Sequence, residues 1–121
     1  MESTAIEPLV LPTSPPLHPI DAQGRYNPAP GTEYPFSISD IGRAAARLLG
    51  DDWDADSTGW GVGAYIEHAD ELGGFKIHVD EEGDLYVRRN YLEPEYLTDL
   101  RPDDGLATVA SHVATVMRRY L

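Results

Sequence analysis

The residues best able to do chemistry in this chain are carboxylates, and they are concentrated in its middle. Residues 51–104 contain sixteen Asp and Glu residues but four Lys and Arg residues, a formal charge of −12. The segments before and after contribute −2 and +2. Such a surface repels phosphate and attracts cationic surfaces. We therefore expect no direct binding of nucleic acid, and we expect a basic protein as the partner.

These acids do not match a known metal-binding motif. Asp52, Asp54 and Asp56 alternate as the ligands of a calcium loop do. An EF-hand loop also needs Gly at its sixth position and a bidentate Glu at its twelfth. This chain has Ser57 and Gly63 there, and it has no cysteine for a thiolate zinc site. A looser calcium site stays open, but the sequence predicts no cofactor.

The histidines are the second group of candidates. His68 lies in the loop after a predicted strand, near Asp70, whereas His78 lies within a strand and His112 on a helix. Catalysis needs a nucleophile, a base and an orienting group brought together, and no recognised arrangement is visible. The alternative function is a small-ligand or metal-dependent enzyme that uses His68, His78 and nearby acids.

Hydrophobic periodicity predicts the elements that position these residues. Apolar residues recur at helical spacing over residues 39–49, with Ser37 or Ser39 as the N-cap and Gly50 as the stop. Alternating patterns predict three strands, and a second amphipathic stripe predicts a final helix. The strands cover residues 60–67, 75–80 and 85–88, and the final helix runs from residue 103 or 104 to the C-terminus.

A hairpin joins the second and third predicted strands. Residues 80–84 have the Asp and Gly positions of a type I turn closed by a left-handed glycine. The pairing that this turn imposes sets Val79 opposite Leu85 on one face of the sheet. On the other face it sets His78 opposite Tyr86.

The predicted fold is α+β: a two-layer sandwich in the order helix, three-stranded antiparallel sheet, helix (αβββα). The two helices cover one face of the sheet, and the other face stays open to solvent. Residues 1–35 hold eight of the ten prolines, so we predict a disordered, proline-rich tail followed by one domain over residues 36–121.

The leading hypothesis is a non-catalytic acidic interaction module. It binds a basic protein as an inhibitor, an immunity-type protein or a regulator, and its carboxylates can imitate the charge of a nucleic acid. The predicted partner-binding residues combine acids with aromatic and imidazole rings: Asp51, Asp52, Asp54, Trp60, Tyr65, His78, Asp80, Glu81, Glu82, Asp84 and Tyr86.

Several broader expectations follow from composition. The apolar runs are too short to span a bilayer, and no secretory signal is visible, so we expect a cytoplasmic protein without membrane contact. Eight of the nine basic residues are arginine, which suggests a GC-rich bacterial genome or its phages or plasmids. The net charge favours a monomer. A structural subunit, in which Val109, Val113 and Met117 pack on another copy, is a third possibility.

Overall fold

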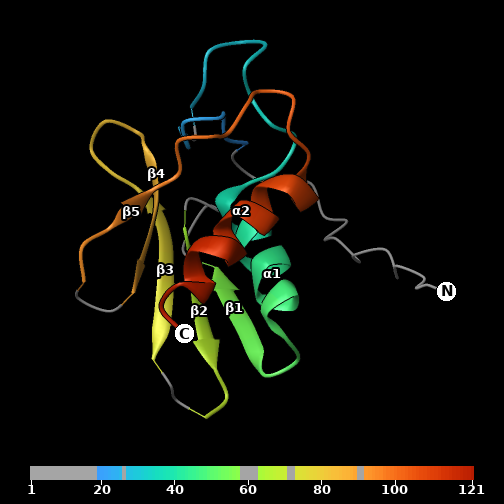
Figure 1. Cartoon of the computed structure of the whole chain (residues 1–121). Helices are drawn as coiled ribbons and strands as arrows, with labels where there is room; N and C mark the ends of the chain where they lie inside the picture. Colours follow the sequence, from blue (N-terminus) through green and yellow to red (C-terminus); the bar gives the residue numbers. More distant parts are fainter. Residues whose placement is uncertain (1–18, 26, 58–62, 71–72, 90–91) are drawn as a thin grey trace, which may run out of the picture.

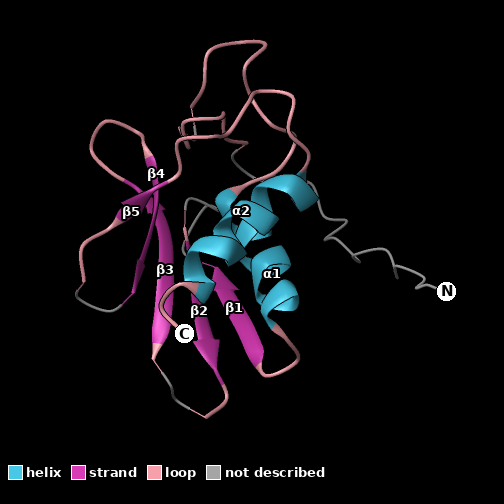
Figure 2. Ribbon diagram, in the orientation of Figure 1, coloured by secondary structure: helices cyan, strands magenta, loops and turns pink. Residues whose placement is uncertain are grey.

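The described part of the chain contains two helices and five strands, joined by loops and turns. The computed structural model describes residues 19–121 apart from residues 26, 58–62, 71–72 and 90–91. In chain order the elements are α1 (Ile38–Leu49), β1 (Trp53–Ser57), β2 (Ala64–His68), β3 (Gly74–Val79), β4 (Leu85–Arg89), β5 (Glu95–Tyr96) and α2 (Leu106–Arg118). The helices pack on one face of an antiparallel sheet with strand order β1-β2-β3-β4-β5 (Figure 1; Figure 2). The α+β class is therefore as predicted.

Helix α1 begins with a reciprocal cap. The Asp40 backbone N–H donates to the Ser37 hydroxyl at 3.3 Å, and the Ser37 N–H donates to the Asp40 carboxylate at 3.0 Å. This capping box satisfies two N–H groups that have no partner within the helix. Ser39, the other predicted cap, instead donates from its hydroxyl to the Gly63 carbonyl at 3.0 Å and ties the helix to the start of β2.

The two layers come closest where α1 crosses β2. A Cβ placed on Gly42 would lie 2.4 Å from the Cβ of Ala64, which no packed structure tolerates. Glycine at position 42 therefore allows the helix backbone to rest directly on the sheet. This contact fixes the height of α1 above β1 and β2.

The core lies between the helices and the inner face of the sheet. The buried strand residues are Ala64, Ile66, Phe75, Ile77, Leu85 and Val87. Val109, Val113 and Met117 of α2 are fully buried in this core. They are therefore not available to pack on another copy, contrary to the third possibility above. Neither helix has the length and apolarity that a membrane crossing requires within the described chain.

The β3–β4 hairpin matches the prediction residue by residue. Val79 pairs with Leu85, and His78 pairs with Tyr86. The turn is closed by a hydrogen bond of 3.0 Å from the Asp80 N–H to the Asp84 carbonyl, and Gly83 has a φ of 86°. Agreement between turn chemistry and apolar alternation fixed this register.

The prediction of three strands is wrong, because two more strands extend the sheet at its edges. Residues 53–57 precede the first predicted strand, but they form β1, which pairs with β2. Trp53 and Ala55 point toward the core while Asp54 and Asp56 alternate outward. Aspartate is depleted in strands, so the two outward aspartates made these residues resemble a loop although apolar and polar residues alternate along them.

The fifth strand lies between the third predicted strand and the final predicted helix, where the sequence predicted no element. Glu95 and Tyr96 form β5, which pairs with Val87 and Tyr86 of β4. Two residues are too few to show a period in sequence. The first predicted strand, residues 60–67, is also displaced, because β2 begins at Ala64, and residues 60–62 lie outside the described residues.

The core begins upstream of the domain boundary predicted at residue 36. Ile20 and Tyr34 are 0% and 1% exposed, although they were assigned to the tail. The Ile20 N–H donates to the Phe36 carbonyl at 3.2 Å, and the Tyr34 hydroxyl donates to the Arg101 carbonyl. These are single apolar residues between prolines, so no periodic pattern revealed them. Residues 1–18 of the predicted tail lie outside the described residues.

Candidate functional site

The face of the sheet turned away from the helices carries its polar and aromatic side chains. We call this the open face. Cross-strand register places His78, Tyr86 and Tyr96 in one row, and Lys76 beside Arg88 in the next. Along the β1 and β2 side lie Asp54, Asp56, Tyr65 and Glu67.

The row of three rings continues toward the β3–β4 turn. The ring centres of His78 and Tyr86 lie 6.4 Å apart, and those of Tyr86 and Tyr96 lie 5.8 Å apart in an edge-to-face arrangement. Tyr96 is 41% exposed. Tyrosine is among the residue types that are enriched where single side chains dominate the binding energy of a protein interface. We call these three residues the aromatic row.

The turn itself, residues 80–84, holds four carboxylates, and Asp80 organises it. Its carboxylate accepts hydrogen bonds from the Glu82 N–H at 2.8 Å, the Asp84 N–H at 3.0 Å and the Tyr96 hydroxyl at 3.0 Å. The backbone hydrogen bond from Asp84 is the main reason that the pKa of Asp80 falls below its ordinary value. The same Tyr96–Asp80 bond raises the pKa of Tyr96. Asp80 therefore stays ionised and joins the acidic turn to the aromatic row.

Glu81 and Glu82 are exposed at the tip of this turn, and Asp84 is half-buried at its base. Carboxylate oxygens of Asp80, Glu82 and Asp84 lie within 4.8 Å of one another, a spacing that a cation can bridge. Exposed acids commonly come this close without binding a metal, and Asp80 already holds the turn together through its own oxygens. The spacing alone assigns no metal.

The cations of the fold lie elsewhere or are already engaged. Three arginines form ion pairs with acids outside the turn: Arg25–Asp21, Arg43–Asp40 and Arg119–Glu95. Three others donate to backbone carbonyls: Arg88 to Leu92, Arg89 to Tyr120 and Arg118 to Leu48. Among the described residues, no ion pair joins a Lys or Arg to residues 80–84.

The predicted site residues divide into separate groups. The structure brings together His78, Tyr86 and the four acids of the turn. Asp51 and Asp52 lie at the opposite end of the sheet, in the turn before β1. Asp54 and Tyr65 occupy the far side of the open face. Trp60 lies outside the described residues.

His68 and His78 do not share a site. His68 follows the inward-facing positions of β2 and packs edge-to-face on Trp53 with ring centres 4.9 Å apart, whereas His78 lies on the open face. The Nε2 atom of His68 is 4.0 Å from the Asp52 carboxylate, at the end of the sheet where β1 begins. The two imidazoles are thus on opposite faces.

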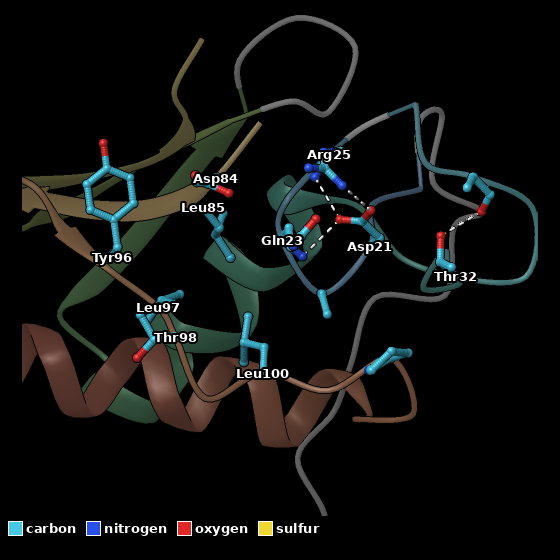
Figure 3. Close-up of a pocket in the computed structure, with 13 residues that line it drawn as sticks. Asp21, Gln23, Arg25, Thr32, Asp84, Leu85, Tyr96, Leu97, Thr98 and Leu100 are labelled. Atoms are coloured by element: carbon cyan, nitrogen blue, oxygen red, sulfur yellow. Dashed lines mark hydrogen bonds and ion pairs between the residues drawn. The ribbon is translucent and has the colours of Figure 1, made fainter. Parts of the chain in front are cut away.

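Sequence reasoning missed a cavity of about 620 Å³ behind the acidic turn (Figure 3). Its walls come from three separate segments: residues 21–32, the start of β4, and residues 96–102. The first segment was assigned to the disordered tail, and the third lies where no element was predicted, so no signal in sequence joined them. Tyr96 lines this cavity as well as the open face.

One wall of the cavity is held by two glycines. A Cβ on Gly24 would lie 2.6 Å from the Cβ of Leu85, and a Cβ on Gly83 would lie 2.6 Å from the Cγ of Arg25. Both glycines have positive φ, of 85° and 86°. The turn at residues 21–25 therefore packs directly against the acidic turn.

Comparisons of the chain with models of protein families, with curated protein sequences and with solved structures give no match.

Proposed function

We propose that this chain is a non-catalytic interaction protein that binds a basic protein partner through the acidic turn and the aromatic row. The observation that carries the proposal is that residues 80–84 present four carboxylates without a Lys or Arg ion pair among the described residues. A cationic surface can neutralise these acids without first breaking a pair within the fold. Charge complementarity of this kind raises the association rate and selects against acidic partners.

The aromatic row supplies what charge alone does not. Ion pairs at an exposed surface contribute about 0–1 kcal/mol each, so carboxylates alone steer a partner but bind it weakly. Tyr86 and Tyr96 add apolar area with few rotatable bonds, which lowers the entropy lost on binding. The hydrogen bond from Tyr96 to Asp80 places this area next to the acids.

A purely structural role accounts for part of the acidity. Asp54 and Asp56 lie on the edge strand β1, where outward charge discourages pairing with another sheet. This argument does not extend to Glu81 and Glu82, which lie in a turn and not on a strand edge. We therefore place the partner contact at the turn and not at β1.

The enzyme alternative gains no support from the geometry. It requires His68 and His78 near one cavity with acids, and these residues lie on opposite faces of the sheet. His78 uses its Nδ1 atom in a hydrogen bond of 2.9 Å with the Val79 carbonyl.

Capture experiments with matched variants test the proposal. The immobilised chain is exposed to a cell extract at several salt concentrations, and the captured basic protein is purified for kinetic measurement. In Glu81→Gln/Glu82→Gln we expect the association rate at low salt to fall by about three- to tenfold, and the difference to vanish at high salt. The control Asp51→Asn/Asp52→Asn removes the same charge at the opposite end of the sheet and should leave the rate within about twofold.

Two outcomes contradict the proposal. One is that no basic protein binds at low salt, or that its binding ignores ionic strength. The other is that both double variants lower the rate equally, because the net charge and not the acidic turn then determines binding.

A further inference from the structure

The cavity behind the acidic turn has an apolar floor. Leu85, Leu97 and Leu100 line it, together with Ala22 and Pro102. Figure 3 shows Leu85 on one side, Leu97 and Leu100 below, and Arg25 and Gln23 opposite. A volume of about 620 Å³ is within the usual range for a ligand site.

The rim of the cavity carries one charge that the fold does not balance. Asp21 is satisfied: it accepts from the N–H groups of Gln23 at 2.9 Å and Arg25 at 3.0 Å, and the Arg25 guanidinium lies 3.8 Å away. The half-buried carboxylate of Asp84 accepts no hydrogen bond and forms no ion pair among the described residues. Arg25 and Asp21 offset each other, so Asp84 leaves the rim negative.

The remaining polar groups on the rim are hydrogen-bond acceptors as well. The amide of Gln23 and the hydroxyl of Thr98 are exposed, and both can accept an N–H. An apolar floor below a carboxylate and several acceptors is complementary to a long aliphatic stem that ends in a cation with several N–H groups.

We propose that this cavity receives an arginine side chain of the basic partner, with the methylene stem on the half-buried Leu97 and Leu100 and the guanidinium at Asp84. The inference rests on the proposed function for the source of that side chain. Arginine fits better than lysine because its planar guanidinium is weakly hydrated and offers five donors, whereas the ammonium of lysine keeps its water more strongly.

The positive charge of Arg25 should weaken the binding of an arginine side chain in the cavity. The stem of Arg25 lies across Gly83, so its own positive charge lies beside the site and opposes a second guanidinium. Removal of this charge should strengthen binding, whereas removal of the Asp84 charge should weaken it. A cavity that binds through apolar contact alone would respond to neither change.

The test is a titration of the isotope-labelled full chain with N-acetyl-arginine amide, followed by amide chemical shifts in NMR spectra. We expect shifts centred on Leu85, Leu97 and Leu100, and an affinity of about 1–10 mM. N-acetyl-citrulline amide has nearly the same shape without the charge, and it should bind at least about fivefold more weakly. Asp84→Asn should weaken arginine binding about fivefold, and Arg25→Gln should strengthen it about twofold.

A matched control is Glu93→Gln, which removes one exposed charge outside the cavity and should leave arginine binding unchanged. The Asp84 side chain makes no hydrogen bond in the turn, so Asp84→Asn should remain folded. An NMR spectrum like that of the wild type will show that its affinity for the arginine probe can be compared with that of the wild type. Equal binding of arginine and citrulline amides, shifts centred elsewhere, or an unchanged affinity in Asp84→Asn would overturn the inference.

The same reagents separate this inference from the proposed function. If a basic protein binds through the acidic turn but neither Asp84→Asn nor the arginine probe has an effect, the cavity inference alone fails. If the probe binds in the cavity but no basic protein is captured, the site binds guanidinium groups and the proposed function alone fails.

Discussion

Substitution of Gly42 by alanine should destabilise the fold, although alanine is the better helix former. In an exposed helix the change would stabilise the folded state by about 1 kcal/mol. Here the new Cβ would lie 2.4 Å from the Cβ of Ala64, whereas ordinary contacts begin near 3.4 Å. The helix must therefore move by about 1 Å in a close-packed core, where such overpacking costs about 1–3 kcal/mol. The net expectation is a loss of up to about 2 kcal/mol in the free energy of unfolding.

Urea unfolding followed by circular dichroism measures this loss, whose upper end corresponds to a fall of roughly 8 °C in Tm. Ala64→Gly removes the atom that collides, so the double variant Gly42→Ala/Ala64→Gly should recover stability relative to the sum of the single variants. A coupling free energy of about 1–2 kcal/mol is expected. A stabilised Gly42→Ala variant, or additive single effects, would refute the close approach of α1 to β2.

Three further outcomes test other parts of the fold. Ile20→Ala should cost about 2–5 kcal/mol in urea unfolding, because Ile20 is fully buried, and a cost below about 0.5 kcal/mol would place the residue in a flexible tail instead. The hydrogen bonds that the ionised Asp80 carboxylate accepts in the turn stabilise the fold fully above the ordinary carboxyl pKa of 3.8, and this stabilisation is lost as the pH falls through the lowered pKa of the folded state. The difference in unfolding free energy between the wild type and Asp80→Asn should therefore shrink in acid. A difference that stays constant with pH would contradict this role of Asp80. Burial raises the pKa of Tyr34 from 10.0 to about 12. The neutral, buried hydroxyl of Tyr34 therefore contributes fully to the free energy of unfolding below pH 10, and this contribution is lost as the pH rises from 10 to about 12. In absorbance titrations, the tyrosine that ionises at the highest pH in the wild type should be missing from Tyr34→Phe. If the high-pH step persists in Tyr34→Phe, the hydroxyl of Tyr34 is solvated and the expectation is wrong.

The parts of the fold that sequence predicted are those with a complete local pattern. The β3–β4 hairpin combined Asp80 and Gly83 at the right turn positions with alternating apolar residues on both sides, so two independent rules gave one register. Helix α1 combined a helical apolar stripe with a serine cap. Each element was therefore specified by residues within a few positions of one another.

The missed elements depend on distant contacts. Strand β1 contains two aspartates in five residues, and its strand conformation is stabilised by pairing with β2 and by Trp53 and Ala55 against the core. Strand β5 pairs with β4 through two residues after Pro94. Ile20 and Tyr34 reach the core as single residues in a proline-rich segment. No local rule detects a residue whose only conformational preference comes from the tertiary structure.

The candidate site also contains residues that a local pattern predicted and residues that only distant contacts bring into place. The acids of the turn and their neighbours His78 and Tyr86 followed from the hairpin register, so their proximity was predictable. Tyr96 was not, because its place beside Tyr86 requires β5. The cavity requires three segments that are far apart in sequence, and its existence could come only from the folded arrangement.

The distribution of charge between the two layers gives the proposed contact a direction. Residues 51–96, which contain the five strands, hold thirteen acidic and three basic residues, a balance of −10. Helix α1 and residues 106–121 hold four arginines and one aspartate, a balance of +3. The helices cover the inner face of the sheet, so the negative potential is concentrated on the strands and turns (Figure 2). A basic partner is repelled by the helical layer and attracted to the sheet. Under the proposed function, orientation before contact would therefore bring a basic partner to the side that carries the acidic turn, where the aromatic row and the cavity would provide the short-range contacts.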